Sequence, residues 1–314
     1  MMRSARLWVG VFILVLCGCA SPPQTRALLD ASSGPLPRRI ELVEVPFFAQ
    51  EDYQCGPAAL AMSLNASGIK ATPDALMPEV YLPDRHGSLQ VEMLAASRRH
   101  GAVAYQLAPE LNDLLTEVAD GTPVVVLQNL ALSWYPIWHY AVVIGYDLDN
   151  AEIILRSGRE QRQVLPMRTF EYTWARSDYW AMATLPPDRI PRTAEENRFI
   201  AAVSALEKVG YPERAYSAYI SALKRWPGSL VAQIGAGNTA YRMHDLVRAE
   251  AAFRQIVLDH PDSVAALNNL AQTLSDQGRH AEALPFAQHA VGLGGPLAEL
   301  AKATLAEIES KLRQ

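Results

Sequence analysis

Cysteine is scarce in this sequence, and the common metal and nucleotide motifs are missing. Its 314 residues include three cysteines and seven histidines. There is no His-Glu-x-x-His pair, no spaced Cys/His set, no Gly-x-Gly-x-x-Gly and no phosphate-binding loop that ends in Lys-Ser or Lys-Thr. Such motifs hold zinc, dinucleotides and nucleoside triphosphates. We therefore expect neither a metal ion nor a nucleotide cofactor.

Positive charge is not in excess either. Lysine and arginine number 28 against 33 acidic residues, which gives a formal net charge of −5. This balance leaves no basic footprint for nucleic acid, so we expect no nucleic-acid partner. Half of the residues are hydrophobic, as in a globular protein, and the length allows about two domains.

The apolar run at residues 7–16 is too short to span a bilayer, but it suits the core of an export signal. It follows Arg3 and Arg6 and ends in Leu16-Cys17-Gly18-Cys19, which resembles the bacterial lipobox. The resemblance implies a signal peptide at 1–18, a lipid on Cys19 that anchors the protein in a membrane, and a place in the cell envelope, on the periplasmic side of the outer membrane. An ordinary cleaved secretory signal is the alternative. Residues 19–40 are rich in Ser, Pro, Gly and Ala, which predicts a flexible tether.

With the other two cysteines removed or lipidated, Cys55 is the one free thiol of an exported protein. Exported proteins normally pair their cysteines, so a leftover thiol indicates a reactive group or an intermolecular bond. Cys55 also begins a predicted helix, with Pro57 in its first turn and Gly68 as its stop. The positive end of the helix dipole favours a thiolate there. A buried structural cysteine is the alternative.

Residues 41–186 mix helical and strand patterns. Helices come first and strands follow, which favours an α+β fold. Asp147-Leu148-Asp149-Asn150 has turn chemistry and predicts a hairpin between two of the strands. The predicted strands are 42–48, 123–127, 139–146, 152–155 and 179–185, and the predicted helices after the Cys55 helix are 88–99, with Ser88 as its cap, 110–119 and 170–175.

Beyond a proline-containing linker at 187–195, the composition turns to Ala, Leu, Glu and Arg with a 34-residue period. Ala215, Ala249 and Ala283 mark one of its registers. The pattern resembles the tetratricopeptide repeat, with three units at about 196–229, 230–263 and 264–297 and an end helix to residue 314. The resemblance implies an all-α solenoid whose concave face docks a protein partner. A generic helical bundle is the alternative.

His139 stands at the start of the apolar strand Trp138-His139-Tyr140-Ala141-Val142-Val143-Ile144. A polar imidazole at the end of a buried strand is costly unless it is paired, and a hydrogen-bonded core histidine would satisfy this. Trp134, Tyr135 and Trp138 just before it could line a groove or pack in the core.

Taken together, Gln50, the helix start Cys55-Gly56-Pro57-Ala58-Ala59 and the His139 strand resemble the C39-like cysteine peptidases, a branch of the papain-like group. The resemblance implies a papain-like α+β domain at 41–186 with Cys55 as nucleophile and His139 as general acid and base. It also implies Gln50 as oxyanion donor beside the Cys55 N–H. Gln54 competes for that role, but it is adjacent to Cys55 and poorly placed to fold back onto the same face.

This sequence departs from the resemblance after the histidine strand. Relatives commonly carry Asp-Pro there to orient the imidazole, whereas this chain has Leu155-Arg156-Ser157-Gly158. Counting along the hairpin puts residues 157–160 opposite His139, so Ser157 is the best orienter and Glu160 the alternative. Asp147 is excluded, because eight residues of strand carry it about 26 Å away.

The function we expect is hydrolysis of a peptide or protein substrate through a thioester on Cys55. Two alternatives remain open on the sequence. One is a weak or inactive peptidase-like domain that binds peptides as a scaffold, since a serine stabilises an imidazolium less than a carboxylate does. The other is acyl transfer or amidase chemistry, which the same residues serve equally well.

Overall fold

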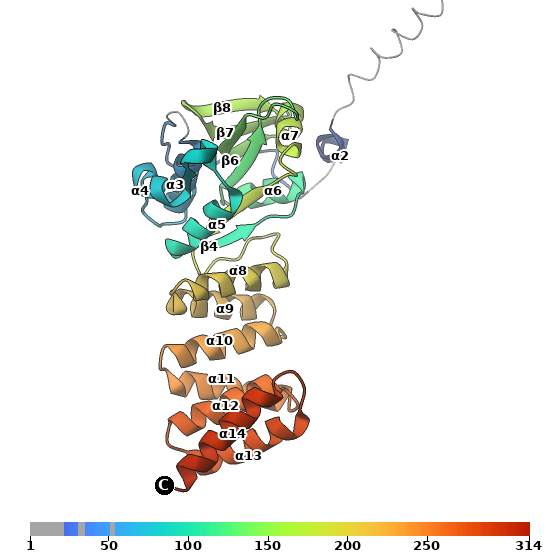
Figure 1. Ribbon diagram of the computed structural model, residues 1–314. Coiled ribbons are helices and arrows are strands. Elements are labelled where there is room, and N and C mark those ends of the chain that lie inside the picture. Colours follow the sequence, from blue (N-terminus) through green and yellow to red (C-terminus); the bar gives the residue numbers. More distant parts are fainter. Residues whose placement is uncertain (1–21, 31–34, 51–53) are drawn as a thin grey trace, which may run out of the picture.

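The computed structural model describes residues 22–30, 35–50 and 54–314. It has a domain of helices and strands at one end and a stack of helices at the other (Figure 1). The predicted signal peptide and Cys19 lie outside the described residues. Within the described ranges, no helix has the length and apolar character needed to cross a membrane.

An antiparallel sheet forms the centre of the first domain. Each strand pairs with its spatial neighbours, and β1 (Arg39–Glu41) pairs with the end of β6 beyond the main path. A separate small hairpin joins β2 (Tyr81–Leu82) to β3 (Gly87–Ser88). The spatial order of the main strands is β4 (Val103–Gln106), β9 (Ala181–Leu185), β5 (Val124–Asn129), β6 (Trp138–Asp147), β7 (Glu152–Ser157) and β8 (Glu160–Pro166).

Helices cover both faces of this sheet (Figure 1). In β5, Val125 and Leu127 pack with the first group of helices, and Val124 and Val126 pack with the second group. This alternation places apolar side chains on both faces, which explains why the strand sequences are continuously hydrophobic. The first group is α3 (Cys55–Ala66), α4 (Pro73–Val80) and α5 (Gln90–Arg99), and the second is α6 (Leu111–Ala119) and α7 (Met167–Ala175). The predicted α+β class is confirmed.

The prediction of a flexible tether over residues 19–40 is wrong where the structure describes them. Helix α2 (Pro23–Asp30) docks beside α6 and α7. The buried carboxylate of Glu171 in α7 accepts the backbone N–H groups of Gln24 and Thr25, at 3.0 and 2.5 Å. A carboxylate at the first turn of a helix satisfies N–H groups that have no partner within the helix. This long-range contact fixes a segment whose composition alone indicated a tether.

The predicted strand at 42–48 is also wrong, because the strand is β1 at Arg39–Glu41 and the chain then runs irregularly to residue 50. Arg156, a buried residue of β7, accounts for the difference. Its guanidinium donates to the carbonyl of Val43 at 3.1 Å and to that of Val45 at 3.1 and 3.3 Å. These carbonyls are satisfied by a side chain and need no strand partner.

Seven helices form the second part: α8 (Glu196–Lys208), α9 (Pro212–Arg225), α10 (Leu230–Arg242), α11 (Leu246–Asp259), α12 (Val264–Asp276), α13 (His280–Leu293) and α14 (Ala298–Leu312). The first helices of successive pairs begin at 196, 230 and 264, a spacing of 34. Gly210, His244 and Gly278 stand in the turn within each pair, and all three have positive φ. The same turn is thus repeated three times, as the 34-residue period predicts.

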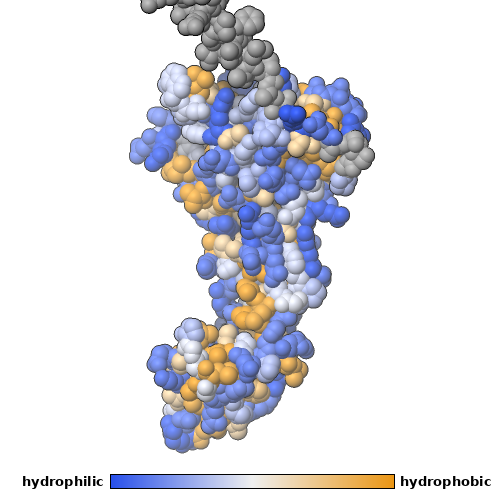
Figure 2. Space-filling view, turned by 90° about the vertical axis from the view of Figure 1, so that its right-hand side faces the viewer, coloured by the Kyte–Doolittle hydropathy of each residue, from blue (hydrophilic) through white to orange (hydrophobic). Residues whose placement is uncertain are grey.

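The first repeat helix shares the core of the sheet domain. Phe199 and Val203 of α8 belong to the apolar cluster that includes the α6 and α7 side of the sheet. Glu117 of α6 is fully buried, and its carboxylate accepts the backbone N–H and hydroxyl of Thr193 at 2.7 and 2.8 Å. Burial raises the pKa of Glu117. Figure 2 shows this junction as a narrowing below the wide sheet domain.

Candidate active site

Three of the predicted site residues meet in one open pocket of about 1290 Å³. Gln50, Cys55 and His139 all line it. They come from the irregular segment after β1, the first residue of α3 and the second residue of β6. The fold therefore brings together a thiol, an imidazole and an amide from distant parts of the sequence.

Cys55 lies at the N-terminus of α3, as its sequence predicts. Its backbone N–H is one of the first helix N–H groups, which have no acceptor within the helix. The next residue, Gly56, packs directly on Ser88, and a Cβ at position 56 would lie 2.2 Å from the Ser88 Oγ. Ser88 is thus part of β3, paired with Tyr81, and it is not the predicted cap of α5. Only glycine fits after Cys55 in this packing.

Burial shifts the pKa values of both Cys55 and His139. Burial raises the pKa of the Cys55 thiol, and the backbone N–H groups of Tyr140, Gly56 and Cys55 itself offset this only in part. Burial also lowers the pKa of His139. Both shifts arise because desolvation penalises the charged forms. Burial thus opposes the effect that the helix dipole is predicted to have on the Cys55 thiol.

Ser157 lies where the hairpin count places it. Its Oγ is 3.0 Å from Nε2 of His139, and the residue is buried. The register of the β6–β7 pair shifts between Val143 and Gly145, which lie between the hairpin turn and this contact. Because Nε2 is engaged by the serine, Nδ1 is the ring nitrogen left for the thiol.

Neither carboxylate considered from the sequence serves the ring. Glu160 stands across the tight β7–β8 turn from Ser157, is exposed, and accepts a hydrogen bond from Gln163 at 3.3 Å. Asp147 lies at the far end of β6, where it binds Arg39 and Asn150. Among the described residues, no ion pair opposes the effect of burial on the pKa of His139.

Gln50 is buried, and two contacts hold it at the pocket. Its backbone N–H donates to the carbonyl of Gly158 at 2.9 Å, and its Nε2 donates to the carbonyl of Tyr140 at 3.4 Å. An amide nitrogen carries two hydrogens, so one remains for a ligand in the pocket. Gln54 precedes the first turn of α3 and is not among the residues that line the pocket. The geometry thus favours Gln50 over Gln54 as the donor.

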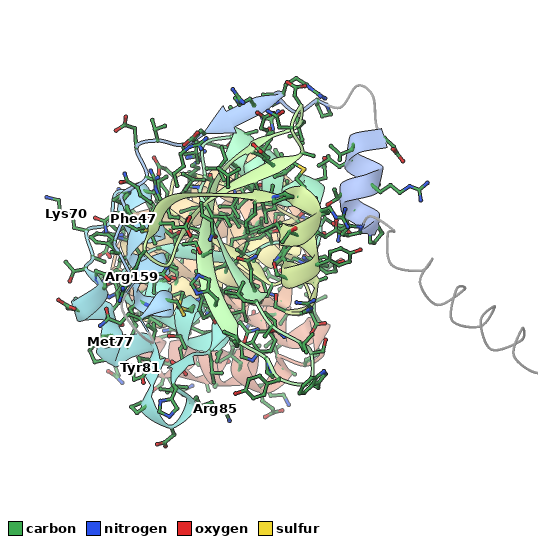
Figure 3. The ribbon with its side chains drawn as sticks, turned by 90° about the horizontal axis from the view of Figure 1, so that it is seen from above. Phe47, Lys70, Met77, Tyr81, Arg85 and Arg159 are labelled. Carbon is green, nitrogen blue, oxygen red and sulfur yellow. The ribbon has the colours of Figure 1, made fainter. Side chains whose placement is uncertain are left out.

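Sequence reasoning missed part of the pocket wall. Asp84, Arg85 and His86 line it from the β2–β3 hairpin. Figure 3 shows Tyr81 and Arg85 at the outer edge of the domain. The turn chemistry of Pro83-Asp84 and Gly87 was the available signal. The aromatic side chains before His139 are exposed, so the core-packing alternative for Trp134, Tyr135 and Trp138 is wrong.

Metal ligation finds no support in the described ranges. No three His, Cys, Asp or Glu side chains there are grouped so that they could hold an ion. The pocket brings together the Cys55 thiol, the His139 imidazole and the Gln50 amide, and Ser157 contacts the imidazole. This set can attack a carbonyl and move a proton without help from a metal.

Comparisons with known proteins match the two parts of the chain to two different families. Residues 42–182 match the model of the Peptidase_C39 like family, and residues 234–298 match a tetratricopeptide repeat model. A comparison with curated proteins gave no match.

Solved structures are similar to the first domain. The crystal structure of a C39-like peptidase from Bacillus anthracis is 20% identical, with a TM-score of 0.41, and the alignment covers 48% of this chain and 98% of that one. A double glycine motif protease from an AMS/PCAT transporter, in complex with the leader peptide, is 19% identical, with a TM-score of 0.34 and coverage of 45% and 91%. This chain thus has a domain of the C39-like peptidase family, followed by tetratricopeptide repeats.

Proposed function

We propose that this protein is a cysteine peptidase that hydrolyses peptide bonds in its C39-like domain. The observation that carries the proposal is the meeting of Cys55, His139 and Gln50 in one pocket, with the imidazole held from behind by Ser157. Membership of the first domain in a peptidase family supports it. A thiol, a base and an oxyanion donor are the three groups that such a reaction needs.

The reaction begins at Cys55. Its Sγ attacks the scissile carbonyl as Nδ1 of His139 takes the thiol proton, and burial, which disfavours the charged form of each group, supports this order. The oxyanion accepts hydrogen bonds from Gln50 Nε2 and the Cys55 N–H. The imidazolium then protonates the leaving amine, and a thioester remains on Cys55. Finally, His139 takes a proton from water, the hydroxide attacks the thioester carbonyl, and the acid is released as Cys55 Sγ leaves and regains the proton from His139.

Ser157 sets a limit on this activity. Its hydroxyl fixes the ring at 3.0 Å, but it carries no negative charge to stabilise the imidazolium. A carboxylate in this place would both orient and stabilise the charged ring. We therefore expect a slower enzyme than one with an acid at this position. The same observation supports the second candidate function, a peptide-binding scaffold with little turnover.

We also propose that the protein is a lipoprotein of the cell envelope, anchored through Cys19. The docking of α2 supports a close attachment, because the helix starts at Pro23, four positions after Cys19, which is at most about 14 Å of extended chain. The repeats then project from the anchored domain and dock a protein partner. Palmitate labelling that disappears in Cys19→Ala would support this anchoring, and labelling that persists would contradict it.

Covalent labelling tests the proposed catalysis. An epoxysuccinyl reagent of the E-64 type should modify wild-type protein at Cys55, as read by mass spectrometry. His139→Ala should slow the modification by about 100-fold or more, since positioned bases contribute at least this much. His289→Ala, in a repeat helix, is the matched control and should have no effect.

Two results would count against the proposal. Labelling that ignores His139 would remove the histidine from the mechanism. A Cys55→Ala protein that still supports the full cellular role would favour the scaffold.

A further inference from the structure

Residues 130–138, which are the connection from β5 to β6 and the first residue of β6, expose an unusual amount of apolar surface. We call this segment the apolar loop. Its six large apolar side chains are 49% to 80% exposed, with Trp134 the most exposed. They are Leu130, Leu132, Trp134, Tyr135, Ile137 and Trp138. Single exposed apolar residues are ordinary, but a contiguous group marks a surface that something covers.

Polar contacts hold the apolar loop in shape. The side-chain oxygen of Asn129 accepts the N–H groups of Ala131 and Ile137, both at 3.0 Å. Arg176 of α7 donates to the carbonyls of Asn129 and Ala131 at 3.2 and 2.7 Å. These bonds fix the backbone, so the apolar side chains stand on a frame that needs little ordering when a ligand binds.

One half of the loop belongs to the pocket. Tyr135, Ile137 and Trp138 line the same cavity as Cys55. Trp138 is also the immediate neighbour of His139, the proposed base. Trp134 has the larger exposure, but it is not among the residues that line the pocket. The loop thus has a pocket half and an outer half.

The rest of the rim has a different character. Asp84, Arg85 and His86 line the pocket from the β2–β3 hairpin, and the hydroxyl of Tyr140 donates to the Ser88 carbonyl at 3.2 Å at the base of that hairpin. The pocket is therefore apolar beside His139 and polar along the hairpin. A segment that lies across Cys55 meets both surfaces.

We propose that the pocket half of the apolar loop selects substrates, and that the preferred peptide carries a large aromatic or branched aliphatic side chain next to the scissile bond. That side chain packs on Tyr135, Ile137 and Trp138 while Cys55 attacks. This inference rests on the proposed peptidase function, whose site these residues adjoin. The occupant is an apolar peptide side chain because the surface is continuous with the pocket that holds the nucleophile.

Matched peptides test the selection. Two fluorogenic decapeptides would be compared that differ only in the residues flanking the scissile bond. The Phe peptide has Phe at both of these positions, and the Ser peptide has Ser at both. Wild-type protein should cleave the Phe peptide with a kcat/KM at least about 10-fold higher than that for the Ser peptide, which is the usual effect of a large apolar group in a pocket. The double variant Y135S/W138S should reduce that ratio to about 3-fold or less by the same measure.

Two controls locate the effect. Trp134→Ser removes the most exposed ring from the outer half of the same loop, and it should leave the ratio unchanged. Val247→Ser removes an exposed apolar side chain from α11 and should do the same. If the variant Y135S/W138S still cleaves peptides but the kcat/KM ratio of Phe to Ser peptide is unchanged, the proposed selection is overturned and the proposed peptidase function stands.

Binding separates the two proposals. A Cys55→Ala protein is titrated with the fluorescein-labelled Phe and Ser peptides, with anisotropy as the readout. Preferential binding of the Phe peptide that Y135S/W138S abolishes would support the selection, even where wild-type protein cleaves nothing and the peptidase proposal fails.

A membrane is the other occupant that exposed tryptophan suits. The protein would be tested for co-sedimentation with vesicles of phosphatidylethanolamine and phosphatidylglycerol. Two results together would overturn the selection in favour of a bilayer: co-sedimentation that is lost most strongly in Trp134→Ser, and a kcat/KM ratio of Phe to Ser peptide that Y135S/W138S does not change.

Discussion

The two ends of this molecule are stabilised in different ways. In the sheet domain, single buried polar side chains join segments far apart in the sequence, as Arg156 joins β7 to residues 43–45 and Glu171 joins α7 to α2. In the repeats, the same small buried residues recur every 34 positions, as at Ala215, Ala249 and Ala283. One lost contact in the first region therefore disconnects a segment, whereas one change in the second is shared among neighbours.

The largest effect should come from Arg156→Met. Its guanidinium donates to the carbonyls of Val43, Val45 and Gln161, and methionine would remove all three hydrogen bonds and leave the buried Val45 carbonyl without this donor. At about 1 kcal/mol for each carbonyl, the free energy of unfolding should fall by about 3 kcal/mol. The segment it holds leads to Gln50, so labelling of Cys55 should slow as well.

Urea denaturation measures the first effect and reagent labelling the second. Arg162→Met is the matched control, because that arginine of β8 makes an exposed pair with Glu41 of β1. A loss as large in the control as in Arg156→Met would mean that charge, and not the buried contacts, is responsible.

The docked helix α2 offers the next test. Glu171→Ala removes the carboxylate that accepts the N–H groups of Gln24 and Thr25, and the loss of such a cap costs about 1–2 kcal/mol. Hydrogen exchange of residues 22–30 should accelerate by about 10-fold, while exchange in β5 stays the same. Asp30→Ala removes an exposed pair with Arg26 in the same helix and should change little. Unchanged exchange of residues 22–30 in Glu171→Ala would contradict the conclusion that Glu171 fixes this segment.

These contacts also show where sequence reasoning stops. Ser157 was predictable because a hairpin fixes register by counting, and the repeats were predictable because their contacts recur at one period. The docking of α2 depends on a glutamate 147 positions away, which no local pattern records. The effect of burial on the pKa of Cys55 escapes sequence reasoning for a related reason, because the helix dipole is a local effect and burial is a property of the whole fold.

Ser157→Asp tests how far the site depends on its uncharged orienter. A carboxylate 3 Å from Nε2 would favour the imidazolium and raise the pKa of His139, which burial now lowers. The charged ring would in turn lower the raised pKa of Cys55. The pH profile of iodoacetamide labelling should then move to lower pH, and the rate at pH 7 should rise by about 10-fold for each pKa unit gained.

Ser157→Ala serves as its counterpart. It removes the hydroxyl without adding charge, so labelling should slow and the profile should not move to lower pH. A profile that is the same in wild type, Ser157→Asp and Ser157→Ala would mean that residue 157 does not act on the ring.

The smallest expected effect lies in the repeats, and it distinguishes one repeat from the other two. His244 has a φ of 59° in the turn where the flanking repeats have Gly210 and Gly278. A side chain in this left-handed region is strained, whereas glycine adopts it freely. His244→Gly should therefore raise the free energy of unfolding by about 0.5–1 kcal/mol, and Gly278→Ala should lower it by a similar amount. Thermal unfolding of both variants measures the difference. A gain in His244→Gly shows that strain in one turn limits the middle repeat, and a loss shows that the histidine contributes contacts that outweigh its strain.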